Sequence, residues 1–200
     1  MKLLVFSDLH SDFRAAAKLV QLSSEADVVV GAGDFCNVRR GLEEIIQALS
    51  TIKKPTVLVP GNSESDPELA NACRLWAGAH VLHGRQATID GVDFYGLGGG
   101  IPITPFGSWS YDFTEGEAED LLQDCPAGGV LVSHSPPKGI LDISSDGRSL
   151  GSEAVRETII QKEPLLVVCG HIHGSAGQID KLGETTVINA GPHGVFWELE

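Results

Sequence analysis

Short apolar runs alternate with amphipathic stretches along the whole chain, with no internal repeat and no evident linker. The runs KLLVF, DVVVGAG and PTVLVPG have the length and β-branched content of buried strands. The stretches near residues 12–24 and 38–51, which separate these runs, have the periodicity of helices. Strands that alternate with helices indicate βαβ units and a mainly parallel sheet.

The second half of the chain predicts a hairpin followed by further buried strands. ATIDGVDFYGLG predicts two strands joined at Asp90 and Gly91, and VLVSH and LLVVCGH resume the buried pattern. Helices are expected over 66–77, 115–124 and 152–162. Ser152 is the expected N-cap of the last helix. The tail segments GQIDKL, TTVINAG and GVFWELE predict antiparallel strands that close a mixed sheet, so we expect one α/β domain over residues 1–200 with two packed sheets.

The composition indicates an ordinary soluble protein. Hydrophobic residues make up 42% and charged residues 20% of the 200 residues, enough to form a substantial core. The N-terminus MKLLVFSD is too short for a signal-peptide core, and no apolar run approaches membrane-spanning length. We therefore expect a cytoplasmic protein without a membrane partner, and its four cysteines, which form no CxxC pair, are expected to be reduced thiols.

The net charge of −13 limits the kinds of partner. A protein that binds duplex DNA through a broad basic surface would carry an excess of positive charge. A nucleic acid is therefore not the expected partner. A phosphate substrate remains compatible with this charge, because bound metal cations would reverse the local sign.

Five apolar runs end in residues that are able to bind a metal ion. These residues are Asp8 with His10, Asp34, Asn62, His134, and His171 with His173. Any one of them alone is typical of a helix N-cap or a turn. In open α/β sheets, however, ligands bind at the carboxyl ends of the strands. Carboxylates, imidazoles and one amide suit manganese, iron or zinc better than calcium or copper(I).

The pair in VVCGHIHG has a spacing of two residues. In an extended backbone, residues i and i+2 point to the same side, so the rings of His171 and His173 can converge on one charge. The alternative is a polar turn after a strand.

The ordered set DLH at 8–10, GD at 33–34, GN at 61–62, SH at 133–134 and GHIH at 170–173 resembles the calcineurin-like metallophosphoesterases. The resemblance spans nearly the whole chain and implies a four-layer α/β/β/α sandwich of two mixed sheets. It also implies two metal ions at the strand ends. One ion would be held by Asp8, His10, Asp34 and His173, and the other by Asp34, Asn62, His134 and His171, so that Asp34 bridges them.

The same resemblance implies a hydrolase with two divalent metal ions, manganese first, with iron, zinc or magnesium as alternatives. Asp34, Asn62 and His134 are the expected catalytic residues. The substrate would be a small phosphoester, attacked in line by hydroxide that bridges the two ions, and no protein nucleophile would be required.

The sequence departs from the family pattern at GNSES. Many members have a histidine after the asparagine, which serves as the general acid, followed by an acidic residue; here these positions are Ser63 and Glu64. A serine hydroxyl is too weak an acid for that role near pH 7, so a phosphodiesterase is favoured over a broad phosphomonoesterase. His193 could supply the missing proton if it faces the site, although an exposed loop position is the other reading.

A second resemblance, to a subgroup of small metallophosphoesterases, covers residues 133–152. In this subgroup a Pro-Pro loop follows the first metal histidine of the second half, here as Pro136 and Pro137 after His134. Lys138 and Arg148 of this long loop could grip a phosphate or line the contact of a homodimer, or they could be solvated surface charges.

Two further segments carry candidate binding residues. The Gly- and Pro-rich stretch 98–113 carries Phe106, Trp109 and Tyr111 among its aromatic residues. They could stack on a nucleobase or an apolar leaving group, or they could pin the loop to the core. Arg39 and Arg40 follow Asn37, the expected N-cap of the helix at 38–51; they could help to hold an anion near Asp34 or form an exposed pair.

Two other functions remain open. A non-catalytic scaffold of the same fold that binds protein partners would be expected to have a degraded ligand set, whereas all seven ligand positions are filled here. A nuclease is disfavoured by the acidic charge.

Overall fold

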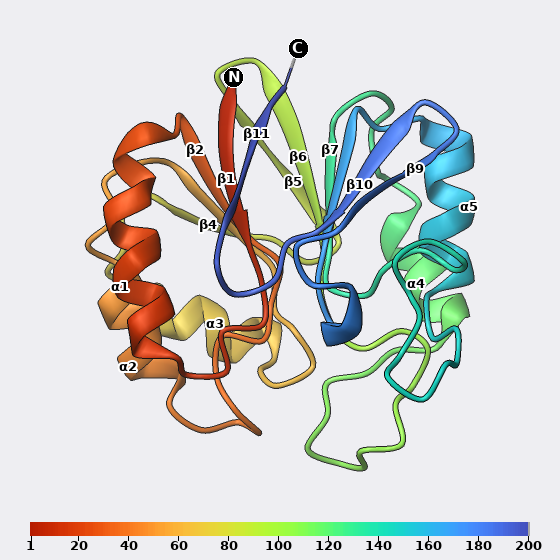
Figure 1. Cartoon of the computed structure of the whole chain (residues 1–200), viewed down its shortest axis with the longest axis horizontal. Helices are drawn as coiled ribbons and strands as arrows, with labels where there is room; N and C mark the ends of the chain where they lie inside the picture. Colours follow the sequence, from red (N-terminus) through yellow and green to blue (C-terminus); the bar gives the residue numbers. More distant parts are fainter. Residues whose placement is uncertain (200) are drawn as a thin grey trace.

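Two β-sheets form the centre of this computed structural model, which describes residues 1–199 (Figure 1). In order across the first sheet, the strands are β11 (Val195–Glu198), β1 (Lys2–Phe6), β2 (Val28–Gly31), β3 (Thr56–Leu58) and β4 (Ala79–Val81). The second sheet has the order β5 (Arg85–Ile89), β6 (Val92–Leu97), β7 (Val130–Ser133), β8 (Leu166–Cys169), β10 (Thr185–Asn189) and β9 (Ile179–Leu182). Both sheets are mixed, because the first sheet has one antiparallel edge strand, β11, and the second has two, β5 and β9, beside otherwise parallel strands.

Helices cover the outer face of each sheet. The first sheet carries α1 (Phe13–Leu22), α2 (Leu42–Leu49) and α3 (Asp66–Ala72), and the second carries α4 (Glu115–Leu122) and α5 (Glu153–Lys162) (Figure 1). Short 3₁₀ turns span Ser23–Glu25 and His173–Ser175. The four-layer α/β/β/α sandwich expected from the sequence is therefore confirmed.

The sheets meet through the alternating side chains of their strands. On β1, Leu3 and Val5 pack between the sheets, whereas Leu4 and Phe6 pack under the helices. Because both faces of the central strands are covered, these strands are apolar at most positions, as is typical of parallel buried strands. No helix among residues 1–199 combines the length and apolar composition needed to cross a lipid bilayer. The four cysteines are buried and free.

Several predicted elements are confirmed, with two corrections. The hairpin pairs β5 with β6 around the predicted turn, and the Ser152 side chain caps α5 by accepting from Val155 N–H. The helix expected at 38–51 begins only at Leu42, and its N-cap is Gly41 rather than Asn37. Asn37 instead closes a tight turn with Arg40. The helix expected at 66–77 ends at Ala72.

The prediction for the tail is wrong in part. Strand β9 is antiparallel to β10, but β10 runs parallel to β8, and β11 leaves this sheet and joins the first. There it lies antiparallel to β1, with Trp197 opposite Leu3. Strand β4 was not anticipated, because three half-exposed residues give too short a hydrophobic pattern.

Candidate metal centre

The seven predicted ligands lie in the segments that follow β1, β2, β3, β7 and β8, at the same edge of the two sheets. Asp8, His10, Asp34 and Asn62 come from the first sheet, and the three remaining histidines from the second. The structure brings all seven into one connected cluster. Their binding of metal ions stays a prediction.

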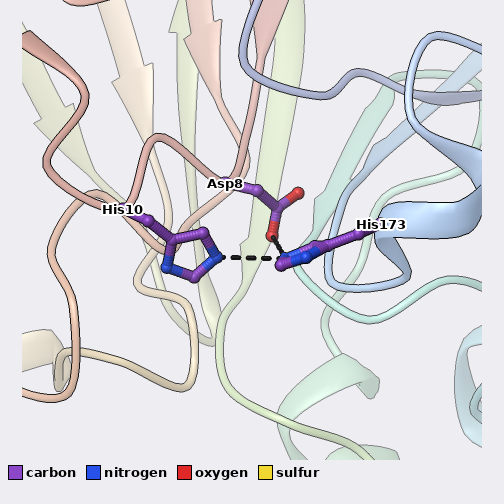
Figure 2. Close-up of side chains that lie close together, drawn as sticks. All are labelled: Asp8, His10 and His173. Carbon is purple, nitrogen blue, oxygen red and sulfur yellow. Dashed lines mark hydrogen bonds and ion pairs between the residues drawn. The ribbon is translucent and has the colours of Figure 1, made fainter.

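Asp8, His10 and His173 form the first group of candidate ligands, and Figure 2 shows their side chains pointing toward one another. The Nε2 atoms of His10 and His173 are 3.0 Å apart, and His173 Nε2 lies 3.6 Å from Asp8 Oδ1. Burial alone would raise the pKa of Asp8. The nearby imidazoles of His173 and His134 and the Ser7 hydroxyl outweigh it and lower that pKa to about 2, so the carboxylate is charged at neutral pH.

Asp34 joins this group to a second one around His134. Its Oδ2 lies 3.6 Å from His10 Nε2, and its Oδ1 lies 3.5 Å from His134 Nε2. His134 is fully buried; its Nδ1 is 2.7 Å from the carbonyl oxygen of Ala32, which leaves Nε2 facing the cluster. Asn62 Oδ1 lies 3.3 Å from that Nε2, and the ring of His171 packs edge-on against His134 with centroids 5.0 Å apart.

The backbone at this edge is unusual, because several ligand residues adopt left-handed conformations that residues with a Cβ rarely adopt. The positive φ angles are 54° at Asp8, 43° at His10, 56° at Asp34 and 65° at His171. Gly61 permits the close approach of two strand ends, since a Cβ there would overlap the Asp34 carboxylate. Such strain commonly gathers at functional sites.

Glu64 is a functional residue to which the sequence analysis gave no role. It is fully buried, and its carboxylate accepts hydrogen bonds from the N–H groups of Asp34 (2.8 Å) and Gly61 (2.7 Å), with longer ones from Phe35 and Cys36. Burial and then the charge of Asp34 raise the pKa of Glu64 to about 7. Glu64 therefore holds together the two loops that carry Asp34 and Asn62. The signal in the sequence is an acidic residue two positions after the predicted strand-end ligand Asn62.

The arrangement fits divalent cations. Carboxylate oxygens and imidazole nitrogens converge within 4.8 Å of one another in two groups, one of Asp8, His10 and His173 and one of Asp8, Asp34 and His134. Burial lowers the pKa of His171 to about 4, which makes the ring neutral near pH 7, the form that binds metals.

A cavity of about 350 Å³ opens directly over this cluster. Five predicted ligands line it together with Ser63, namely His10, Asp34, Asn62, His171 and His173. Apolar side chains form another part of the lining, namely Phe106, Trp109, Leu150 and Ile172. The cavity can therefore hold a phosphoryl group at the cluster and an apolar substituent beside it.

The aromatic residues of the loop 98–113 fall into two groups, one packed against the protein and one lining the cavity, and their binding of a substrate stays a prediction. Tyr111 packs against His83 and so pins the loop, whereas Phe106 and Trp109 line the cavity. Arg39 is not part of the cavity lining. Its Nε donates to the carbonyl oxygen of Trp109 at 2.6 Å, and its guanidinium pairs with Glu68.

The other candidate charges lie away from the cavity lining in the described part of the chain. Lys138 Nζ donates to the Ser149 carbonyl oxygen at 2.8 Å, within its own loop. Arg148 is exposed and pairs with Asp146 at 2.7 Å. His193 is exposed near Asp12, and Arg40 is exposed as well.

The sequence analysis missed some of the cavity lining. Leu150, Ser144 and Ser145 come from the loop after the Pro-Pro pair, and Ile172 lies between the two predicted histidine ligands. Loop residues have no periodicity that would indicate which way they face, so only their proximity in sequence to the ligands could have marked them.

Comparisons with known proteins agree with this geometry. The sequence model of the family described as calcineurin-like phosphoesterase matches residues 1–175. A protein of Methanocaldococcus jannaschii is 30% identical over 98% of this chain and 90% of its own length. Two solved structures share the fold. A Thermus thermophilus protein is 22% identical with a TM-score of 0.76, covering 96% of this chain and 90% of that one. A dimetal phosphatase of Danio rerio is 14% identical with a TM-score of 0.65, covering 96% and 88%.

Proposed function

Because the chain belongs to the calcineurin-like phosphoesterase family, a family of metal-dependent hydrolases, we propose that it is a phosphodiesterase that uses two divalent ions to hydrolyse a small phosphoester. One observation carries the choice of a diester. Among the described residues that line the cavity, every titratable side chain is a predicted metal ligand. No lining group is left over to serve as an acid for the leaving group.

The residues of this chain would hold the ions and position the substrate. Two divalent ions, when bound, would acidify water and withdraw electron density from the phosphoryl oxygens. Asp34 would be shared between the ions, since its two oxygens face His10 and His134 on opposite sides. Asn62 and the buried His134 would present one amide oxygen and one ring nitrogen to the second ion.

Ser63 supports the diester over the monoester. It occupies the position of the family's general acid, lines the cavity and is 2% exposed. General acid catalysis contributes typically 10²–10⁴-fold, so its absence penalises esters with poor leaving groups. A diester also carries one negative charge, whereas a monoester carries up to two. The diester is therefore repelled less strongly by a protein of net charge −13.

We expect manganese to restore activity best, and a diester to be cleaved at least about tenfold faster than the matched monoester, because the diester carries fewer negative charges toward an acidic protein. The protein would be stripped with a chelator and reloaded separately with Mn²⁺, Fe²⁺, Zn²⁺ or Mg²⁺. Hydrolysis of methyl 4-nitrophenyl phosphate and of 4-nitrophenyl phosphate would then be compared, because both release the same leaving group.

The same assay can contradict the proposal in two ways. Faster cleavage of the monoester with every metal would make the protein a phosphatase. Two bound ions without turnover of either ester would favour the non-catalytic scaffold. The metal content of each reloaded sample, measured by mass spectrometry, separates these results from failed loading.

A further inference from the structure

We propose that Phe106 and Trp109 bind a flat aromatic group that is joined to the phosphoryl group of the substrate. This inference rests on the proposed function, because it places the phosphoryl group at the metal ligands. It goes further by naming the chemical class of the substituent. The two residues belong to the loop 98–113, which the metal-binding motifs do not include.

The first step of the argument is that the aromatic pair and the metal cluster share one cavity. His10, His173 and the two aromatic residues line the same space of about 350 Å³. A phosphoryl group held at the imidazoles would therefore direct one of its substituents along the wall formed by these rings. A volume of this size suits a small organic ligand.

The second step is the shape of the wall. The rings of Phe106 and Trp109 are nearly parallel, with an interplanar angle of 12° and centroids 5.6 Å apart. Phe106 is 51% exposed, so a large part of its ring is available for contact. Flat rings that stack on other flat rings are stabilised beyond the burial of apolar area alone, a gain that an alkyl chain does not share.

The third step is that the wall is held in place. Arg39 donates to the Trp109 carbonyl oxygen at 2.6 Å and pairs with Glu68, which fixes one side of the loop. Tyr111 N–H donates to the Asn62 carbonyl oxygen at 2.9 Å, which fixes the other side to the metal-binding segment. A fixed surface loses little conformational entropy when a ligand binds.

The fourth step is the chemistry of the remaining lining. Apart from the predicted ligands, the described lining offers only uncharged groups, which include the apolar side chains of Leu150 and Ile172, the Asn37 amide and the hydroxyls of Ser63, Ser144 and Ser145. A charged substituent would find no opposite charge there. An apolar ring with a few polar atoms at its edge would match the apolar side chains and the hydroxyl groups of this lining.

The test is the binding of small phosphonates and phosphates to the manganese-loaded protein by calorimetry. We expect phenylphosphonate to bind about tenfold more tightly than methylphosphonate, and Phe106→Ala to remove most of this preference. Adenosine 5′-monophosphate compared with ribose 5-phosphate distinguishes a nucleobase from a simple aryl ring. Ile103→Ala is the matched control, since Ile103 is 61% exposed on the same loop but is not part of the cavity lining.

The outcomes separate this inference from the proposed function. A preference for the aromatic member of either pair, lost in Phe106→Ala and kept in Ile103→Ala, supports the inference even if no ester is hydrolysed. Equal affinities within both pairs, or a preference that survives Phe106→Ala and Trp109→Ala, overturn it even if diesters are cleaved.

A different observation carries a second inference, namely that Ser110 is a positioning residue that sets the orientation of the Asn62 amide. We infer this from the direction of the hydrogen bonds around Asp112. The Asp112 carboxylate can only accept, so the Ser110 hydroxyl, 2.7 Å away, must donate to it. The Ser110 oxygen is then left to accept from the Asn62 amide nitrogen at 3.1 Å.

This chain of donors has one consequence for the metal cluster. With its NH₂ group committed to Ser110, Asn62 must turn its oxygen toward His134 and the cluster. The opposite orientation would present two N–H donors to a cation. Thr104 supports the arrangement, since its N–H donates to Asp112 at 3.0 Å and its hydroxyl donates to the same carboxylate at 2.7 Å.

The test is metal affinity, measured by equilibrium dialysis with mass spectrometry rather than by turnover. Ser110→Ala is expected to weaken one of the two manganese sites about 10–100-fold, as is typical for residues that orient metal ligands. Ser110→Thr should restore it, because threonine keeps the hydroxyl. Ser108→Ala, exposed on the same loop, is the control. Unchanged affinity of both sites in Ser110→Ala, or a loss that threonine does not rescue, overturns the inference.

Discussion

Asp34→Asn is expected to lower turnover of a phosphodiester by roughly three orders of magnitude, since polarisation by bound metal contributes several kcal/mol and each 1.4 kcal/mol is tenfold in rate. The Asp34 carboxylate lies between His10 and His134 and is the negative charge closest to both imidazoles. The asparagine side chain has the same shape but is neutral, so the variant would lack the negative charge that we expect to lie between the two metal ions. The measurement is kcat/KM in excess manganese together with the metal content after dialysis.

A control variant separates the loss of this one charge from a general effect. Asp124→Asn removes an exposed carboxylate far from the cavity lining and should leave both quantities unchanged. Full metal content and normal turnover in Asp34→Asn would be incompatible with a shared ligand at this position and with the proposed mechanism.

Glu64→Ala is expected to lower the free energy of unfolding by about 3 kcal/mol or more, because each buried donor left without a partner costs about 1–3 kcal/mol. Glu64 is fully buried and accepts from the Asp34 and Gly61 N–H groups at 2.8 Å and 2.7 Å. Alanine would leave the N–H groups of Asp34 and Gly61 without a hydrogen-bond acceptor in the buried volume that the Glu64 carboxylate occupies. Denaturant unfolding of the metal-free protein measures the loss without any contribution from ions.

The control for this prediction is Glu157→Ala, which removes an exposed glutamate from α5 and should change stability by less than about 0.5 kcal/mol. If Glu64→Ala were as stable as the control, Glu64 would not be what joins the two ligand loops.

The positions of the ligand segments could be predicted because they depend on local patterns. Asp8, Asp34 and His134 directly follow buried apolar runs, and parallel strands bring the ends of such runs to one edge of a sheet. Ser152 was identified as an N-cap for a similar reason, since its side chain bonds the backbone three residues ahead. In each case the determining interaction lies within a few residues.

Features that depend on distant partners could not be predicted. The role of Glu64 depends on amide groups contributed by residues 34–36, about 30 positions earlier in the chain. The parallel pairing of β10 with β8 and the departure of β11 to the other sheet were missed, because both involve strands whose own patterns fit several partners. Asn37 was taken for a helix cap, whereas the left-handed Gly41, with φ of 81°, precedes the helix.

The return of β11 to the first sheet has a mechanical consequence. The chain forms β1 to β4 of the first sheet and then all six strands of the second sheet before β11 returns to pair with β1, so the first sheet contains strands from both ends of the sequence. The second sheet is therefore connected to the first at both of its chain ends, through the link from β4 to β5 and through β11, which limits the conformational freedom that its strands would gain by unfolding alone. We expect this double connection to restrict separation of the two sheets and so to keep the ligands from both sheets near one another during ordinary thermal fluctuation.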